Sequence, residues 1–314
     1  GSVGCAAVFL VGHAAGGLAC GWISALLLMC NPLYYMHARR AMSDVPAEAF
    51  LLLAVALLLP IFRSQWSGVG VSASLVRWIL GVGILGGLAV LSKLNGLLAF
   101  ISAGAMLVVL LWAPRRSWRG KWLAVSGWTA SLAVGFMLQF AMNPFLTSHP
   151  RVPLGATIQR LRDQPPLERF GELIRHRWVV SRLAAEQFPD DAVVGLTEKL
   201  KVMTVQGFGR FGPLGPRASD STRRYDLKQD WGALIWLPLV AFGGCRLLST
   251  GWAAWKRGAP PMPWFVMAHA LTALVIVTWF LPLAWDRYFL SVQAGGSVLA
   301  AAGLCHWLRP RSPS

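Results

Sequence analysis

The sequence predicts an all-α protein, a polytopic transmembrane helical bundle with short broken helices and one long extracytoplasmic loop region. Apolar residues make up 55% of the chain and charged residues 13%, whereas charged residues are about 25% of a typical soluble domain. Several apolar runs also reach the ~20 residues that a helix needs to cross a bilayer. Sixteen tryptophans suit many membrane–water boundaries, where indole rings prefer to lie.

Hydropathy divides the chain into three parts. Residues 1–141 form an N-terminal transmembrane part, residues 142–230 an extracytoplasmic loop region, and residues 231–314 the C-terminal transmembrane helices. In the loop region Leu167, Phe170, Ile174 and Trp178 recur at helical spacing. This pattern predicts an amphipathic helix that lies on the membrane or on the rest of the protein.

Two apolar runs are too long to cross the membrane once. Residues 4–36 would span about 50 Å as a straight helix, so we expect a break at residues 12–17. Residues 78–112 are interrupted by Ser-Lys-Leu-Asn-Gly at 92–96, where two short half-spans are expected to meet. Between these runs, a helix that starts near Pro46 should end near Pro60. Further spans are expected at 122–141, 232–249, 263–284 and 288–308.

The net charge of +16 points to the membrane and not to nucleic acid. Basic residues lie mainly in short links between apolar runs, as in cytoplasmic loops, and no nucleic-acid-binding motif occurs. If those links are cytoplasmic, all 13 carboxylates fall on the opposite face, and any chemistry should be extracytoplasmic. The five cysteines show no metal-ligand spacing, so no metal site is assigned.

Four polar elements should converge on that outer face: residues 37–48, 93–95, 143–149 and 285–288. A carboxylate there can take a proton from an acceptor hydroxyl, and a lysine or arginine can stabilise the charge on a departing phosphate. We assign Asp44 as the catalytic candidate. The substrate-binding candidates are Arg40, Glu48, Lys93, Asn95, His149, Asp286, Arg287 and Tyr288.

Each of these residues also has a purely structural interpretation. Asp44, two positions before Pro46, could simply be the N-cap of a helix. Lys93 could extend its side chain to the membrane interface, and Asp286 with Arg287 could form a surface ion pair.

Three motifs, in order along the chain, resemble the GT-C glycosyltransferases, in particular the branch of protein O-mannosyltransferases and lipid A aminoarabinose transferases. They are Ala-Arg-Arg-Ala-Met-Ser-Asp-Val-Pro at 38–46, a glycine-rich run that ends in Ser-Lys at 86–93, and Arg-Tyr-Phe-Leu at 287–290. The resemblance implies sugar transfer from a polyprenyl phosphate on the extracytoplasmic side. It makes Asp44 the second acidic residue of the site, and Lys93 and Arg287 candidates for the carrier phosphate, with Tyr288 in support.

The sequence departs from that family at its start, because the family's main catalytic aspartate lies in a first outer loop and nothing before Asp44 is acidic. We expect that this sequence lacks the first span and loop; a catalytically inactive relative is the alternative. A transporter of lipid-linked or anionic substrates is a further hypothesis, since broken helices are typical of transporters.

The expected partners are a lipid-linked sugar donor and membrane lipids, in a multi-pass protein of the bacterial inner membrane. No cofactor is assigned; some GT-C enzymes use a divalent ion, which leaves that alternative open. The sugar, the acceptor and the oligomeric state are not determined by the sequence.

Overall fold

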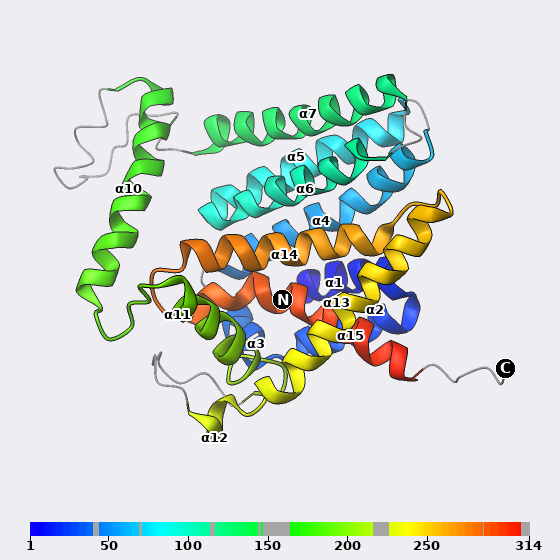
Figure 1. Ribbon diagram of the computed structural model, residues 1–314. Coiled ribbons are helices and arrows are strands. Elements are labelled where there is room, and N and C mark those ends of the chain that lie inside the picture. The colour runs from blue at the N-terminus through cyan, green and yellow to red at the C-terminus, as the bar shows by residue number, and fades with distance from the viewer. Residues whose placement is uncertain are drawn as a thin grey trace.

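The computed structural model describes residues 1–39, 44–68, 71–113, 117–143, 146, 164–215, 226–284 and 286–308, and these ranges contain helices and no β-strand (Figure 1). The N-terminal helices are α1 (Ser2–Gly16), α2 (Leu18–Met29), α3 (Pro32–Arg39), α4 (Asp44–Trp66), α5 (Ala73–Ser92), the 3₁₀ helix η1 (Leu94–Leu97), α6 (Leu98–Leu111) and α7 (Trp118–Met142). The remainder are α10 (Pro166–Gln187), α11 (Leu196–Lys201), the π-helix η2 (Val202–Gln206), α12 (Leu227–Asp230), α13 (Ala233–Lys256), α14 (Met262–Phe280), the 3₁₀ helix η3 (Asp286–Phe289) and α15 (Leu290–Leu308).

The predicted class, an all-α polytopic bundle, is confirmed. Within the described ranges, seven helices are long and apolar enough to cross a membrane, or eight if the pair α2 and α3, bent by 64°, is one span. The predicted breaks after α1 and after α5 are both present.

Two details of the prediction are wrong. The halves on either side of Lys93 are not half-spans, because α5 has 20 residues and the η1–α6 segment has 18. Helix α5 gains its length by starting at Ala73, where the Ser72 hydroxyl accepts a hydrogen bond from the Leu75 amide. Helix α4 does not end near Pro60 but continues to Trp66, since neighbouring helices make proline tolerable inside a membrane helix.

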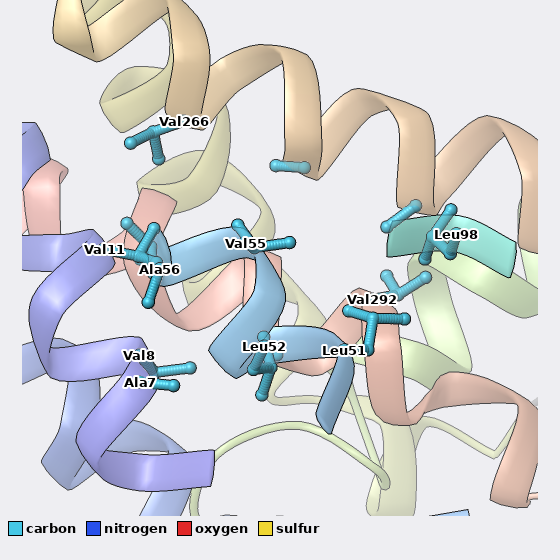
Figure 2. Close-up of a cluster of buried hydrophobic side chains, with 14 of the residues drawn as sticks. Ala7, Val8, Val11, Leu51, Leu52, Val55, Ala56, Leu98, Val266 and Val292 are labelled. Atoms are coloured by element: carbon cyan, nitrogen blue, oxygen red, sulfur yellow. The ribbon is translucent and has the colours of Figure 1, made fainter. Parts of the chain in front are cut away.

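Helices α4 and α15 form the centre of the bundle. In its most apolar 18-residue stretch, α15 is 89% buried and α4 72%, against 28% for α7 and for α13. Figure 2 shows side chains of α1, α4, α6, α14 and α15 meeting in one cluster of buried apolar residues. Helices α13 and α15 pack closely at Gly243, where a Cβ would lie 1.8 Å from the Leu299 carbonyl oxygen.

The predicted amphipathic helix is α10, which runs across the direction of the spanning helices at one end of the bundle (Figure 1). Its Phe170 ring contacts the rings of Phe136 and Phe140 in α7, at 5.3 and 6.0 Å between centroids. Further along, backbone hydrogen bonds join residues 191–193 to residues 282–284 just before η3. The segment between α7 and α13 is thus attached at the end of the bundle where α4 and α15 begin.

Candidate active site

The first turns of α4 carry the two carboxylates of the polar segment. Asp44 and Glu48 are four residues apart, so they lie on one face of the helix. Both are buried, with 7% and 4% of their surface exposed. Charges are costly to bury unless they are paired or hydrogen-bonded, so the partners of these two side chains define the site.

The partner of Asp44 comes from the break between α5 and η1. Lys93 has an extended backbone conformation that ends α5, and its ammonium forms an ion pair with Asp44 Oδ1. The turn is compact because Gly96 lies against the α5 backbone, where a Cβ would be 2.2 Å from the Ala89 carbonyl carbon. The lysine is about one-quarter exposed and the aspartate almost fully buried, so the pair is reached from the lysine side.

Helix η3 brings an aromatic ring and a second cation to the same place. The Lys93 Nζ lies 5.8 Å from the centroid of the Tyr288 ring, and the Arg287 Cζ lies 5.5 Å from it. Both distances are within the range of cation–π interactions. Two cations therefore share one ring beside a buried carboxylate, an arrangement suited to an anionic ligand.

The second carboxylate ties the start of α15 to α4. The Ser291 hydroxyl donates a hydrogen bond of 2.5 Å to Glu48 Oε2, and Glu48 also interacts electrostatically with Lys93 and Asp44. Ser291 follows Tyr288 by three residues, so this bond helps to set the position of the tyrosine ring over Lys93.

The structure brings together five of the predicted site residues. Asp44, Glu48, Lys93, Arg287 and Tyr288 come from α4, the α5–η1 break and η3, which are far apart in sequence. Asn95 is near them in sequence but is exposed. Arg40, His149 and the side chain of Asp286 lie outside the described residues.

Sequence reasoning missed a pair of buried amides behind η3, Asn31 and Gln293, which we call the amide clamp. The Asn31 amide donates to Gln293 Oε1 and to the Phe211 carbonyl, both at 3.0 Å, and Gln293 Nε2 donates to the Gly207 carbonyl. Both amide side chains are fully buried. The only hint in the sequence was a polar residue inside an apolar run, which does not reveal its partner.

The clamp holds the glycine-rich loop 207–215 against the core. The Phe211 ring packs on Phe289 with 4.8 Å between centroids. Arg210 donates two hydrogen bonds to Asp230, at 2.9 and 3.0 Å, in a buried ion pair. The loop is thus fixed at both sides, and it packs against the residue that follows Tyr288.

No group of three or more His, Cys, Asp or Glu side chains in the described part of the chain is arranged to hold a metal ion. The charged groups that the structure places together are the carboxylates of α4 and the cations Lys93 and Arg287.

The fold and this cluster define a multi-pass membrane protein with a paired carboxylate and two cations at one end of its bundle. Residues 2–144 match the family model of the dolichyl-phosphate-mannose-protein mannosyltransferases, a family of GT-C type. The match covers less than half of the chain and supports the resemblance to a glycosyltransferase family that was drawn from the first two motifs. It ends after α7, so η3 and α15 lie beyond it. No curated protein and no solved structure matches the chain.

Proposed function

We propose that the protein transfers a sugar from a polyprenyl-phosphate donor to an acceptor hydroxyl on the extracytoplasmic side of a membrane. The observation that carries the proposal is the Asp44–Lys93 ion pair beside Tyr288. The matched family is described as using a dolichyl-phosphate sugar, which is a polyprenyl phosphate. The long apolar helices supply surface for the lipid part of such a donor.

The reaction requires a base for the acceptor proton and a stabilising group for the negative charge on the departing phosphate. The acceptor oxygen attacks the anomeric carbon, the bond from that carbon to the phosphate oxygen breaks, and the electron pair leaves with the phosphate. The acceptor proton passes to a carboxylate base. Lys93 and Arg287 would bind the departing phosphate, because charge-assisted hydrogen bonds are about twice as strong as neutral ones.

Lys93 contacts both Asp44 and Tyr288. In the proposal it therefore pairs with the carboxylate and also binds the donor phosphate. An ammonium has three donor hydrogens, so a phosphate that approaches from the tyrosine side can share the lysine with Asp44. The phosphate thereby competes with Asp44 for the lysine, at the stage when the acceptor proton must pass to a carboxylate. Arg40, Glu48, Asn95, His149 and Asp286 remain candidates for binding the sugar or the acceptor.

The direct test is transfer by the purified, reconstituted full-length protein from a panel of labelled polyprenyl-phosphate sugars. We expect transfer from at least one of them, and Asp44→Asn should lower it by about 100-fold or more, the usual contribution of a general base. Membrane expression should not change. Asp44→Asn activity close to that of the wild type would remove this residue from the mechanism.

The matched control is Glu172→Gln, which neutralises a carboxylate in a surface ion pair with Arg175 in α10. A surface pair of this kind contributes at most about 1 kcal/mol, so the control should retain activity. Equal losses in both variants would indicate a general effect of lost negative charge.

A transporter remains the second candidate, since the break at Lys93 and the bend between α2 and α3 also suit that class. Transporters place ionisable groups near the middle of the membrane, whereas the carboxylates of the described spanning helices lie near helix starts: Asp44 and Glu48 in the first two turns of α4, and Asp230 at the beginning of the Lys228–Lys256 span. Uptake of a labelled polyprenyl-phosphate sugar into sealed vesicles without any transfer product would favour the transporter.

A further inference from the structure

The end of the bundle opposite the candidate site is basic throughout. The α4–α5, α6–α7 and α13–α14 links lie together there, at the right-hand side of Figure 1. Segments 49–162 and 231–285 contain no aspartate or glutamate at all. The described cations of this end are Arg63, Arg77, Arg119, Lys121, Lys256 and Arg257.

Within the described residues, no carboxylate forms an ion pair with these cations. The ion pairs within the described ranges are Lys93–Asp44, Arg175–Glu172 and Arg210–Asp230, and all of them lie elsewhere. Apart from the partly exposed Lys121, the cations of this end are exposed. These exposed cations are therefore accessible to anionic groups from outside the chain.

Next to two of these cations, four tryptophans form a cluster. Trp255 contacts Trp66 and Trp264, at 5.4 and 5.2 Å between ring centroids, and Trp264 contacts Trp252 at 6.0 Å. The Lys256 ammonium lies 5.3 Å from the centroid of the Trp252 ring. We call these four tryptophans and Lys256 the tryptophan–lysine cluster.

The cluster is held rigidly by its indole hydrogen bonds. Trp66 Nε1 donates to the Gly258 carbonyl and Trp264 Nε1 to the Leu248 carbonyl, both at 3.0 Å. Gly258 ends α13 with a positive φ of 75°, a conformation that glycine adopts without strain. The α13–α14 link, which carries Lys256 and Arg257, is thus fixed to the end of α4.

One face of α13 carries an apolar, an aromatic and a cationic side chain in an order that matches the parts of an anionic phospholipid. Leu248, Trp252 and Lys256 follow at intervals of four residues, so they lie in line along the helix. Leu248 is 49% and Trp252 52% exposed, and Lys256 is exposed at the end. From the bundle outwards the strip is apolar, then aromatic, then cationic, which corresponds to an acyl chain, the membrane interface and a headgroup.

We propose that the tryptophan–lysine cluster binds the headgroup of an anionic phospholipid, with the acyl chain along Leu248 and Trp252. Lysine and arginine near a membrane surface attract anionic lipids, and indole rings prefer the headgroup level. A soluble anion would use the cations but not the exposed apolar strip. This assignment does not depend on the proposed sugar transfer.

The test is lipid retention by the full-length protein, purified from nanodiscs that contain equal amounts of an anionic and a zwitterionic phospholipid. Mass spectrometry of the retained lipid should show enrichment of the anionic one. The double variant Lys256→Gln/Arg257→Gln should lose this enrichment, by roughly fivefold for each removed charge. The matched control, Lys201→Gln/Lys228→Gln, removes two exposed cations of the segment between α7 and α13 and should retain it.

Two further experiments distinguish a bound phospholipid from a soluble anion. Trp252→Ala should lower the enrichment and Trp252→Phe should restore most of it, because the ring is what contacts the lipid. Inorganic phosphate at the same ionic strength as sodium chloride should displace no more lipid than that salt. Preferential displacement by phosphate, equal losses in the control variant, or no enrichment in the wild type would each overturn the proposal.

A measurement on the wild type alone covers the case in which the double variant does not fold. Exposed charges are screened by salt, with a Debye length of about 10 Å at 0.1 M. The enrichment should therefore fall steadily as salt is added to the nanodiscs, and an enrichment that is insensitive to salt would contradict the proposal.

Discussion

Tyr288 is unusual because its ring contacts two cations, Lys93 and Arg287. Like charges repel, and the nearby Asp44 carboxylate pairs directly with Lys93. An anionic ligand would relieve the repulsion and use both cations, and the ring would keep them at a constant separation. The tyrosine is thus a positioning residue in the proposed donor site.

This role predicts a separation between two substitutions of Tyr288. Tyr288→Phe keeps the ring and should leave the KM for the lipid donor nearly unchanged. Tyr288→Leu removes both cation–π contacts, each worth about 0.5–1 kcal/mol where the cation is accessible to solvent, and should raise that KM by about 5- to 30-fold with a smaller effect on kcat. Steady-state kinetics with varied donor concentration measure both constants.

The control for this prediction is Tyr35→Leu in α3. Tyr35 is exposed and its ring lies 5.4 Å from the Arg39 guanidinium, so the substitution removes a similar contact at the surface. It should leave the KM unchanged. If Tyr288→Leu also behaves like the wild type, the ring does not position the cations.

The charged residues of the site could be predicted because charge is rare and costly in an apolar sequence. Asp44, Lys93 and Arg287 attract attention for that reason. Ser291 and the amide clamp do not, since neutral polar residues are common in helices. Asn31 pairs with Gln293 across 262 positions, and no local pattern carries information about such a contact.

At the level of elements, the break between α5 and η1 determines where Lys93 points. Gly96 allows the chain to turn tightly at this break, because its Cα lies against the backbone of Ala89 and Val90. An added methyl group would meet backbone atoms at 2.2 to 2.5 Å, and backbone cannot rotate away as a side chain can. The break is therefore a rigid corner and not a flexible hinge.

We predict that Gly96→Ala displaces η1 and disturbs the Asp44–Lys93 pair. The cost should be of the order of 1–3 kcal/mol, as for overpacking in a well-packed core, together with a large loss of transfer activity. Thermal unfolding in detergent and the transfer assay measure the two effects.

Gly171→Ala in α10 is the matched control. A Cβ at this glycine meets nothing within 4 Å, and alanine favours a helix over glycine by about 1 kcal/mol. This variant should be as stable as the wild type or more so, and fully active. A Gly96→Ala protein that behaves like Gly171→Ala would show that the corner tolerates displacement.

The errors in the element prediction also have a physical origin. A run of apolar residues shows that a span exists, but it does not show where the helix begins. The polar start of α5 at Ala73, capped by Ser72, added a turn and more that hydropathy alone did not include. The extension of α4 beyond Pro60 depends on packing with other helices, which no local rule describes.

At the level of the whole molecule, the order of the apolar spans was predictable because the bilayer sets the length of apolar sequence that crosses it. The position of the segment between α7 and α13 on the bundle was less predictable. Its attachment depends on the amide clamp, on the Arg210–Asp230 pair and on the rings of Phe170 and Phe211. Each of these contacts joins segments that only the folded chain brings together.

The proposed topology predicts opposite accessibility for the two ends of the bundle. In a background without the five native cysteines, Asn95→Cys and Glu172→Cys should react with a membrane-impermeant maleimide in intact cells. Arg63→Cys and Lys256→Cys should react only after the membrane is permeabilised. All four native residues are at least partly exposed, so protein burial should not prevent labelling.

Labelling of Asn95→Cys and Lys256→Cys from the same side would contradict the topology, and with it the extracytoplasmic site. Labelling of all four positions only after permeabilisation would place both ends in the cell interior and would have the same consequence. Equal protein levels of the four variants are the required control.

The two helices that carry the carboxylates and the tyrosine, α4 and the η3–α15 unit, are also the most enclosed spans of the bundle. Most of their residues are buried within the bundle, whereas only 28% of the most apolar stretch of α7 and of α13 is buried. A thicker or thinner bilayer would first tilt those outer helices. The proposed site would thereby be insulated from the mechanical state of the membrane and would keep one geometry in membranes of differing composition.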